Sequence, residues 1–105
     1  MSFFVYHRYG SAEPNPDLSV LPLLLDELNE RPEDTEHGQV SLTHDTEWCL
    51  SASLSGVLIW ENLESGEPKH MLSVSREAVL RLWGLLARGE ISTIDREPWL
   101  PGYPR

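Results

Sequence analysis

The sequence predicts an α+β fold, an antiparallel β-meander sheet with two helices packed on one face, in the order β-α-β-β-β-β-α. Between residues 40 and 74, four consecutive stretches are typical of strands, with turn residues between them. On either side of this block, apolar residues recur at helical spacing. A chain of 105 residues has room for one modest hydrophobic core, so residues 1–105 are expected to form a single domain.

The N-terminal part is predicted to contain one strand, one loop and one helix. Residues 3–9 are aromatic and suit a strand, whereas two prolines close together favour a loop at 11–16. A helix is expected from about Leu18 to Glu30, with Ser19 as its N-cap and Pro32 blocking its continuation. Its inward stripe consists of Leu21, Leu24, Leu25 and Leu28.

The central hairpin is predicted to cover residues 47–63 and to turn at Ser55-Gly56, because glycine accepts a positive φ without steric cost. A two-residue turn would pair Ala52 with Ile59 and place Ile59 on the apolar face of the sheet. Trp60 would then lie on the more polar face. A tryptophan there is either covered by a second layer or available to a partner.

The C-terminal part is predicted to contain a fourth strand at 69–74, a second helix and an extended tail. Ser75 is the expected N-cap and Gly89 the residue that ends the helix. The helix has an apolar stripe, and we expect two of its residues, Trp83 and Leu86, to pack on Leu50 and Ile59. A short turn is expected at 92–96, and two tail aromatics, Trp99 and Tyr103, are expected to dock on the body.

Charge and composition restrict the classes of partner. Seventeen acidic residues against eight basic ones give a net charge of -9, which repels nucleic acid and anionic lipid and favours basic partners. The single cysteine, Cys49, excludes an intramolecular disulfide and fits a reducing compartment. Since no stretch approaches the roughly 20 apolar residues of a membrane span, the sequence favours a cytoplasmic protein without membrane contact.

Few residues are spaced for catalysis or for metal binding. The four histidines are not at ligand spacing, and nothing resembles a phosphate-binding loop, so no metal or cofactor is predicted. His44 and His70 could meet on neighbouring strands as a catalytic pair, although ordinary strand-edge histidines are the favoured interpretation. An enzyme is therefore the weaker hypothesis.

A run of carboxylates at the end of the first helix is the strongest candidate for a binding surface. Negative side chains in the last turns of a helix oppose its dipole by roughly 0.3–1 kcal/mol each, and neighbouring carboxylates repel one another. A partner surface and a solvated helix end are about equally favoured. Glu61, Glu64 and Glu67 could form another edge of the same field, with Trp60 as an apolar anchor. The run consists of Asp26, Glu27, Glu30, Glu33, Asp34 and Glu36.

From Val40 onward the chain resembles small acidic immunity proteins encoded beside bacterial polymorphic toxins. The resemblance covers about residues 40–103 and rests on the stretches VSLTHDTEWCLSAS, SGVLIWENLE, KHMLSVSREAVLRLWGLLARGE and the closing PW-PGY. It implies a protein that neutralises one cognate toxin domain, such as a nuclease, deaminase or ADP-ribosyltransferase, by occluding a basic active-site cleft. A general protein-interaction module without a toxin partner is the alternative, and a small enzyme using His44 and His70 ranks third.

Overall fold

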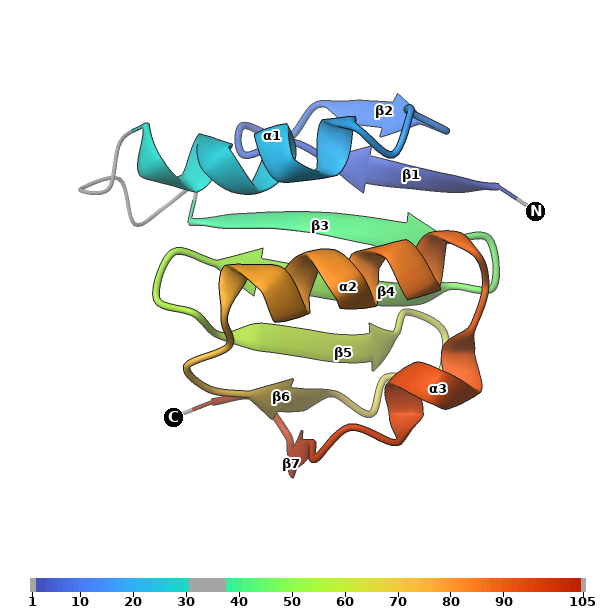
Figure 1. Cartoon of the computed structure of the whole chain (residues 1–105). Helices are drawn as coiled ribbons and strands as arrows, with labels where there is room; N and C mark the ends of the chain where they lie inside the picture. Colours follow the sequence, from blue (N-terminus) through green and yellow to red (C-terminus); the bar gives the residue numbers. More distant parts are fainter. Residues whose placement is uncertain (1, 31–37, 105) are drawn as a thin grey trace.

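The computed structural model describes residues 2–30 and 38–104, and within them the chain forms one antiparallel sheet with helices on one face. Figure 1 shows α1 and α2 lying across the same side of the sheet and α3 at one end of it. The predicted α+β class is therefore confirmed. The elements are β1 (Phe3–Tyr6), β2 (Ala12–Pro14), α1 (Val20–Asp26), the 3-10 helix η1 (Glu27–Asn29), β3 (Gln39–His44), β4 (Trp48–Ser53), β5 (Leu58–Asn62), β6 (Lys69–Met71), α2 (Arg76–Ala87), α3 (Ile91–Asp95) and β7 (Leu100–Pro101).

The sheet has the strand order β2-β1-β3-β4-β5-β6-β7, so the predicted meander of β3 to β6 forms its centre. β1 joins the meander beside β3, and β2 folds back on β1 with Pro14 opposite Phe4. A loop was predicted at 11–16, but residues 12–14 form strand β2. An edge strand tolerates proline, because the missing N–H can lie on the side that has no neighbouring strand.

The β4–β5 hairpin differs from the predicted one by a single step of register. Ser53 N–H donates to the Val57 carbonyl at 3.1 Å, and Gly56 adopts a φ of +83° inside this longer connection. Leu50 consequently pairs with Trp60, whereas Ile59 pairs with Ser51. Because side chains alternate along a strand, this step moves Trp60 to the helix-covered face and Ile59 to the opposite face.

Helix α2 forms as predicted and covers the centre of the sheet. The Ser75 hydroxyl accepts a hydrogen bond from Ala78 N–H at 3.2 Å, and the stripe Val79, Leu82, Trp83 and Leu86 is buried. Trp83 Nε1 donates to the Leu50 carbonyl at 2.9 Å, which confirms the contact with β4. The expected contact with Ile59 is wrong, because Ile59 lies on the other face.

Helix α1 is shorter than predicted and continues as η1 to Asn29. Ser19 occupies the N-cap position, as predicted, but its side chain makes no capping hydrogen bond. The leucine stripe nevertheless packs on the sheet, with Leu21, Leu24 and Leu28 buried. Burial of these leucines against the core therefore stabilises the helix more than capping of its N-terminus does.

The C-terminal tail packs on the body, as expected. Trp99 Nε1 donates to the Ile94 carbonyl at 2.9 Å, and β7 pairs with β6. Tyr103 remains more than half exposed, but its hydroxyl donates to Glu61 Oε2 at 2.7 Å. The residues predicted as a short turn at 92–96 lie largely within α3.

Candidate functional site

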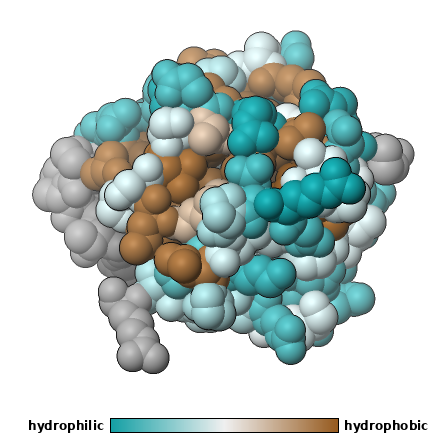
Figure 2. Space-filling model, turned by 60° about the horizontal axis from the view of Figure 1, so that its bottom comes forward, coloured by the Kyte–Doolittle hydropathy of each residue, from teal (hydrophilic) through white to brown (hydrophobic). Residues whose placement is uncertain are grey.

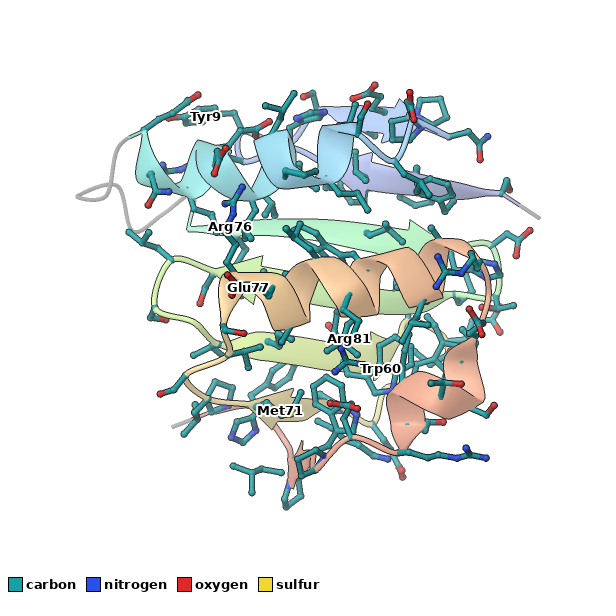
Figure 3. All side chains as sticks on the ribbon, in the orientation of Figure 1. Tyr9, Trp60, Met71, Arg76, Glu77 and Arg81 are labelled. Carbon is teal, nitrogen blue, oxygen red and sulfur yellow. The ribbon has the colours of Figure 1, made fainter. Side chains whose placement is uncertain are left out.

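Two carboxylates of the acidic run, Asp26 and Glu27, are bonded to neighbouring elements. Asp26 forms an ion pair with Arg76 of α2 at 2.5 Å, and Figure 3 shows Arg76 reaching from α2 toward α1. Glu27 accepts a hydrogen bond from Arg8 N–H at 3.0 Å. The run was a candidate surface because its negative charges had no partners nearby in sequence. Asp26 and Glu27 do have partners in the structure. Glu30 is exposed, whereas the predicted site residues Glu33, Asp34 and Glu36 lie outside the described residues.

His7 joins the β1–β2 hairpin to the end of α1. Its Nδ1 lies 2.5 Å from Glu27 Oε2, and its Nε2 lies 2.8 Å from Glu13 Oε1. Hydrogen bonding to Glu27 first, and to Glu13 second, raises the pKa of His7 above 6.5. When it is protonated, the ring can donate to both carboxylates, which gives this cluster a structural role.

Of the two alternatives left open for Trp60, cover by a second layer or access to a partner, the structure shows the first. Its ring has 0% exposure, stacks on Trp48 at 4.5 Å between ring centroids, and donates from Nε1 to Asp95 Oδ1 at 2.7 Å. α3 and the segment after it provide the covering layer, because the register of β5 turns Trp60 toward them. In the isolated chain, Trp60 therefore presents no exposed surface to a partner.

The second group of predicted carboxylates does not join the acidic run. Glu61 accepts from Tyr103 and lies on the face opposite Trp60, whereas Glu64 is exposed in the β5–β6 turn. Figure 1 shows this turn at the right-hand end of the sheet, while η1 ends at the left. The described members of the acidic run, Asp26, Glu27 and Glu30, therefore lie at the opposite end of the molecule from Glu64 and do not form a continuous field with it.

At the right-hand end, turns distant in sequence come together. Leu63 N–H donates to the Glu47 carbonyl at 2.8 Å, which ties the β5–β6 turn to the β3–β4 turn, and α3 lies next to them. Arg88 pairs with Glu90 and Arg81 with Glu97, while Lys69 and Arg96 are the other cations here. We call this region the acidic end, defined by Asp45, Glu47, Glu64, Glu67, Glu90, Asp95 and Glu97.

A pocket of about 560 Å³ opens at the acidic end, between the β5–β6 turn, α3 and the segment leading into β7. Such a volume lies within the range of pockets that hold small ligands. In Figure 2 this end of the surface is mostly hydrophilic, whereas hydrophobic surface gathers toward the other end. The side chains that matter for its chemistry are Glu67, Lys69, Asp95, Glu97 and Trp99.

Three tryptophans form a stack that ends at this pocket. Trp48 stacks on Trp60, and Trp60 stacks on Trp99 with 6.2 Å between ring centroids and 16° between planes. Since Trp99 Nε1 is already bonded to Ile94, the ring is fixed and offers its apolar surface to the pocket. The sequence predicted that Trp99 docks on the body but not that it lines a pocket, because Trp99 meets Glu67 and Lys69 only through the tertiary fold.

The two histidines proposed as a catalytic pair do not meet. β4 and β5 lie between their strands, and the pairing register places them on opposite faces of the sheet. His44 Nδ1 lies 2.9 Å from Thr46 Oγ1, while His70 Nδ1 donates to the Gly102 carbonyl at 2.7 Å. The suggestion that His44 and His70 could act together is therefore wrong.

Metal-binding and membrane-spanning features were sought in residues 2–30 and 38–104. There, histidine, cysteine and acidic side chains form no group of three or more that could hold a metal ion. Over the same residues, every helix is too short or too polar to cross a membrane.

Comparisons of the chain with protein-family models, with curated proteins and with solved structures give no match. The resemblance to immunity proteins therefore stays a prediction.

Proposed function

We propose that this chain is an immunity protein that binds one cognate bacterial toxin domain and blocks its basic, nucleic-acid- or nucleotide-directed active-site cleft. The observation that carries the proposal is the position of Glu47, Glu64 and Glu67 in two turns joined by a backbone hydrogen bond. Within the described part of the chain, none of these three carboxylates has an ion-pair partner. They are available to the cations of another protein.

The net charge of -9 adds a long-range electrostatic attraction for a basic partner to the local attraction of these three carboxylates. Complementary charge raises association rate constants by about 10- to 1,000-fold at low ionic strength, and added salt screens the effect. The pocket beside Glu67 supplies a rigid aromatic wall, which suits the desolvated contacts that slow dissociation. Fast capture and slow release are what an inhibitor of a toxic enzyme requires.

The first test asks whether a toxin gene lies next to the gene for this chain and whether the chain protects against that toxin. A toxin gene is expected immediately upstream of the gene for this chain, and co-expression should restore growth to cells that produce the toxin domain. The purified proteins should bind one to one. A general interaction module would bind a protein without toxic activity and would give no protection, which would contradict the proposal.

A matched pair of variants tests which surface binds. Glu47→Gln, Glu64→Gln and Glu67→Gln together remove three negative charges at the acidic end. Glu30→Gln, Glu33→Gln and Asp34→Asn remove three from the acidic run and serve as the control. We expect the acidic-end variant to lose about tenfold or more in association rate constant at low salt, with a smaller loss at high salt.

The association rate constant of the control is expected to fall much less. Both variants lose three negative charges, and they differ only in where those charges lie. Equal losses in both variants would show that net charge alone steers association. A larger loss in the control would return the binding surface to the acidic run.

A further inference from the structure

The pocket at the acidic end has a lining suited to a planar cation. Trp99 presents its ring, which is supported from behind by Trp60. An indole face attracts a cation through its π electrons, and a guanidinium group also stacks flat against it. The ring cannot donate a hydrogen bond into the pocket, because Nε1–H is already directed at the Ile94 carbonyl.

The acidic groups of the pocket keep acceptor capacity. Asp95 uses Oδ1 for Trp60, and Glu97 uses Oε1 for Arg81, so each carboxylate retains its second oxygen. Figure 3 shows Arg81 directed from α2 toward the end of the sheet where Trp60 lies. Glu67 has no ion-pair partner within the described residues. Three separate acceptors match a guanidinium, which carries five N–H donors in a plane.

Lys69 is the one cationic side chain that lines the pocket among the described residues. It projects on the same face as Trp60, its cross-strand partner, and it opposes a bound cation. Three carboxylates nevertheless outnumber it, although Arg81 neutralises part of the charge on Glu97. The sign of the Lys69 contribution provides a direct test, since removing this charge should improve the binding of a cation.

We propose that this pocket receives the side chain of an arginine supplied by the partner, with its guanidinium stacked on Trp99 and bonded to Asp95 and Glu67. This inference rests on the proposed function, because it names the group that the partner inserts. Arginine is favoured over lysine because the compact ammonium group is more strongly hydrated and cannot stack. The pocket volume of about 560 Å³ leaves room for the aliphatic part of the side chain as well.

The test uses the full chain and small probes, so it does not depend on finding the partner. Nα-acetyl-arginine methylamide, its lysine analogue and its uncharged citrulline analogue are titrated while ¹H–¹⁵N spectra are recorded. We expect the Trp99 indole signal and the amides of residues 66–69 and 95–99 to shift with saturation. The arginine probe should bind more tightly than the lysine probe, and the citrulline probe should bind weakest.

Charge variants show whether each charged side chain strengthens or weakens the binding of the arginine probe. Asp95→Asn keeps an oxygen that can accept from Trp60 while removing the charge, and Glu67→Gln changes an exposed turn residue. Each should weaken binding of the arginine probe about two- to fivefold, whereas Lys69→Gln should strengthen it by a similar factor. Glu77→Gln removes the same charge at the far end of α2 (Figure 3) and should leave the dissociation constant unchanged.

Two outcomes of the probe titrations would overturn the inference. One is equal binding of the citrulline and arginine probes, and the other is an unchanged dissociation constant for Lys69→Gln together with Asp95→Asn. A cognate toxin that binds the Asp95→Asn, Glu67→Gln double variant as tightly as the wild type would also refute the arginine pocket, while the proposed function would stand. Conversely, saturable and charge-dependent arginine binding would support the pocket even if no toxin partner were found.

Discussion

The packing of α2 on the sheet can be tested at Trp83, which is fully buried and donates to the Leu50 carbonyl. Replacing it with alanine removes the largest side chain that α2 buries against the sheet and leaves a cavity in the core. Substitutions of this kind cost about 3–5 kcal/mol of unfolding free energy. Since small domains are stable by only about 5–15 kcal/mol, the Trp83→Ala variant should be close to its folding limit.

A milder change separates the hydrogen bond from the cavity. Trp83→Phe keeps most of the aromatic volume but loses the indole N–H, so it should cost less than Trp83→Ala. The lost hydrogen bond alone accounts for about 0.5–1.5 kcal/mol. Leu23→Ala on α1 is the control, because Leu23 is 64% exposed and its truncation should change stability by less than about 0.5 kcal/mol.

The assay is urea unfolding followed by far-ultraviolet circular dichroism, because removing a tryptophan alters fluorescence directly. At about 4–8 °C per kcal/mol for a domain of this size, Trp83→Ala should also lower the melting temperature by at least about 12 °C. A Trp83→Ala protein within about 1 kcal/mol of the wild type would refute the packing of α2 described above.

Three further predictions concern local contacts. Because the folded-state pKa of His7 is raised, its stabilising contribution is complete below about pH 6.5 and is lost as the pH rises through the folded value. The difference in unfolding free energy between wild type and His7→Gln should therefore shrink between about pH 6 and pH 9, and a constant difference would contradict the role of this ring. Because Gly56 has a φ of +83°, Gly56→Ala should lower the unfolding free energy by about 1–2 kcal/mol in chemical denaturation. Gly84→Ala in α2 should instead raise it by up to about 1 kcal/mol. A Gly56→Ala protein more stable than the Gly84→Ala protein would contradict the described turn. Ser75→Ala removes the acceptor for Ala78 N–H and should cost about 0.5–2 kcal/mol, measured in the same way, while Ser75→Asp should restore most of the loss.

The sequence was sufficient for the fold class and for α2, because a capping serine, a regular apolar stripe and a terminal glycine all agree. It was insufficient for the hairpin, where Leu58 and Trp60 compete with Val57 and Ile59 for the core face. Both alternations are apolar, so periodicity cannot decide between them. One step of register, produced by the length of the turn, decides whether Trp60 is buried or exposed.

The candidate site depended on long-range contacts in the same way. The ion pair of Asp26 with Arg76 joins residues 50 positions apart, and the hydrogen bond from Trp60 to Asp95 joins residues 35 apart. The charge of Asp26 can be read from its local sequence, but the cation that pairs with it cannot. Whether Trp60 is covered could not be decided either, because nothing near it in sequence indicates that α3 folds over the ring.

The two outermost strands have a consequence for self-association. β2 is three residues long and contains Pro14, and β7 is two residues long and contains Pro101. Short strands with proline offer few backbone donors to an incoming chain, and they interrupt the ladder that sheet-to-sheet polymerisation requires. Growth into fibrils through either border of the sheet is therefore disfavoured. A binding partner is expected to engage side chains rather than extend the sheet with a strand of its own.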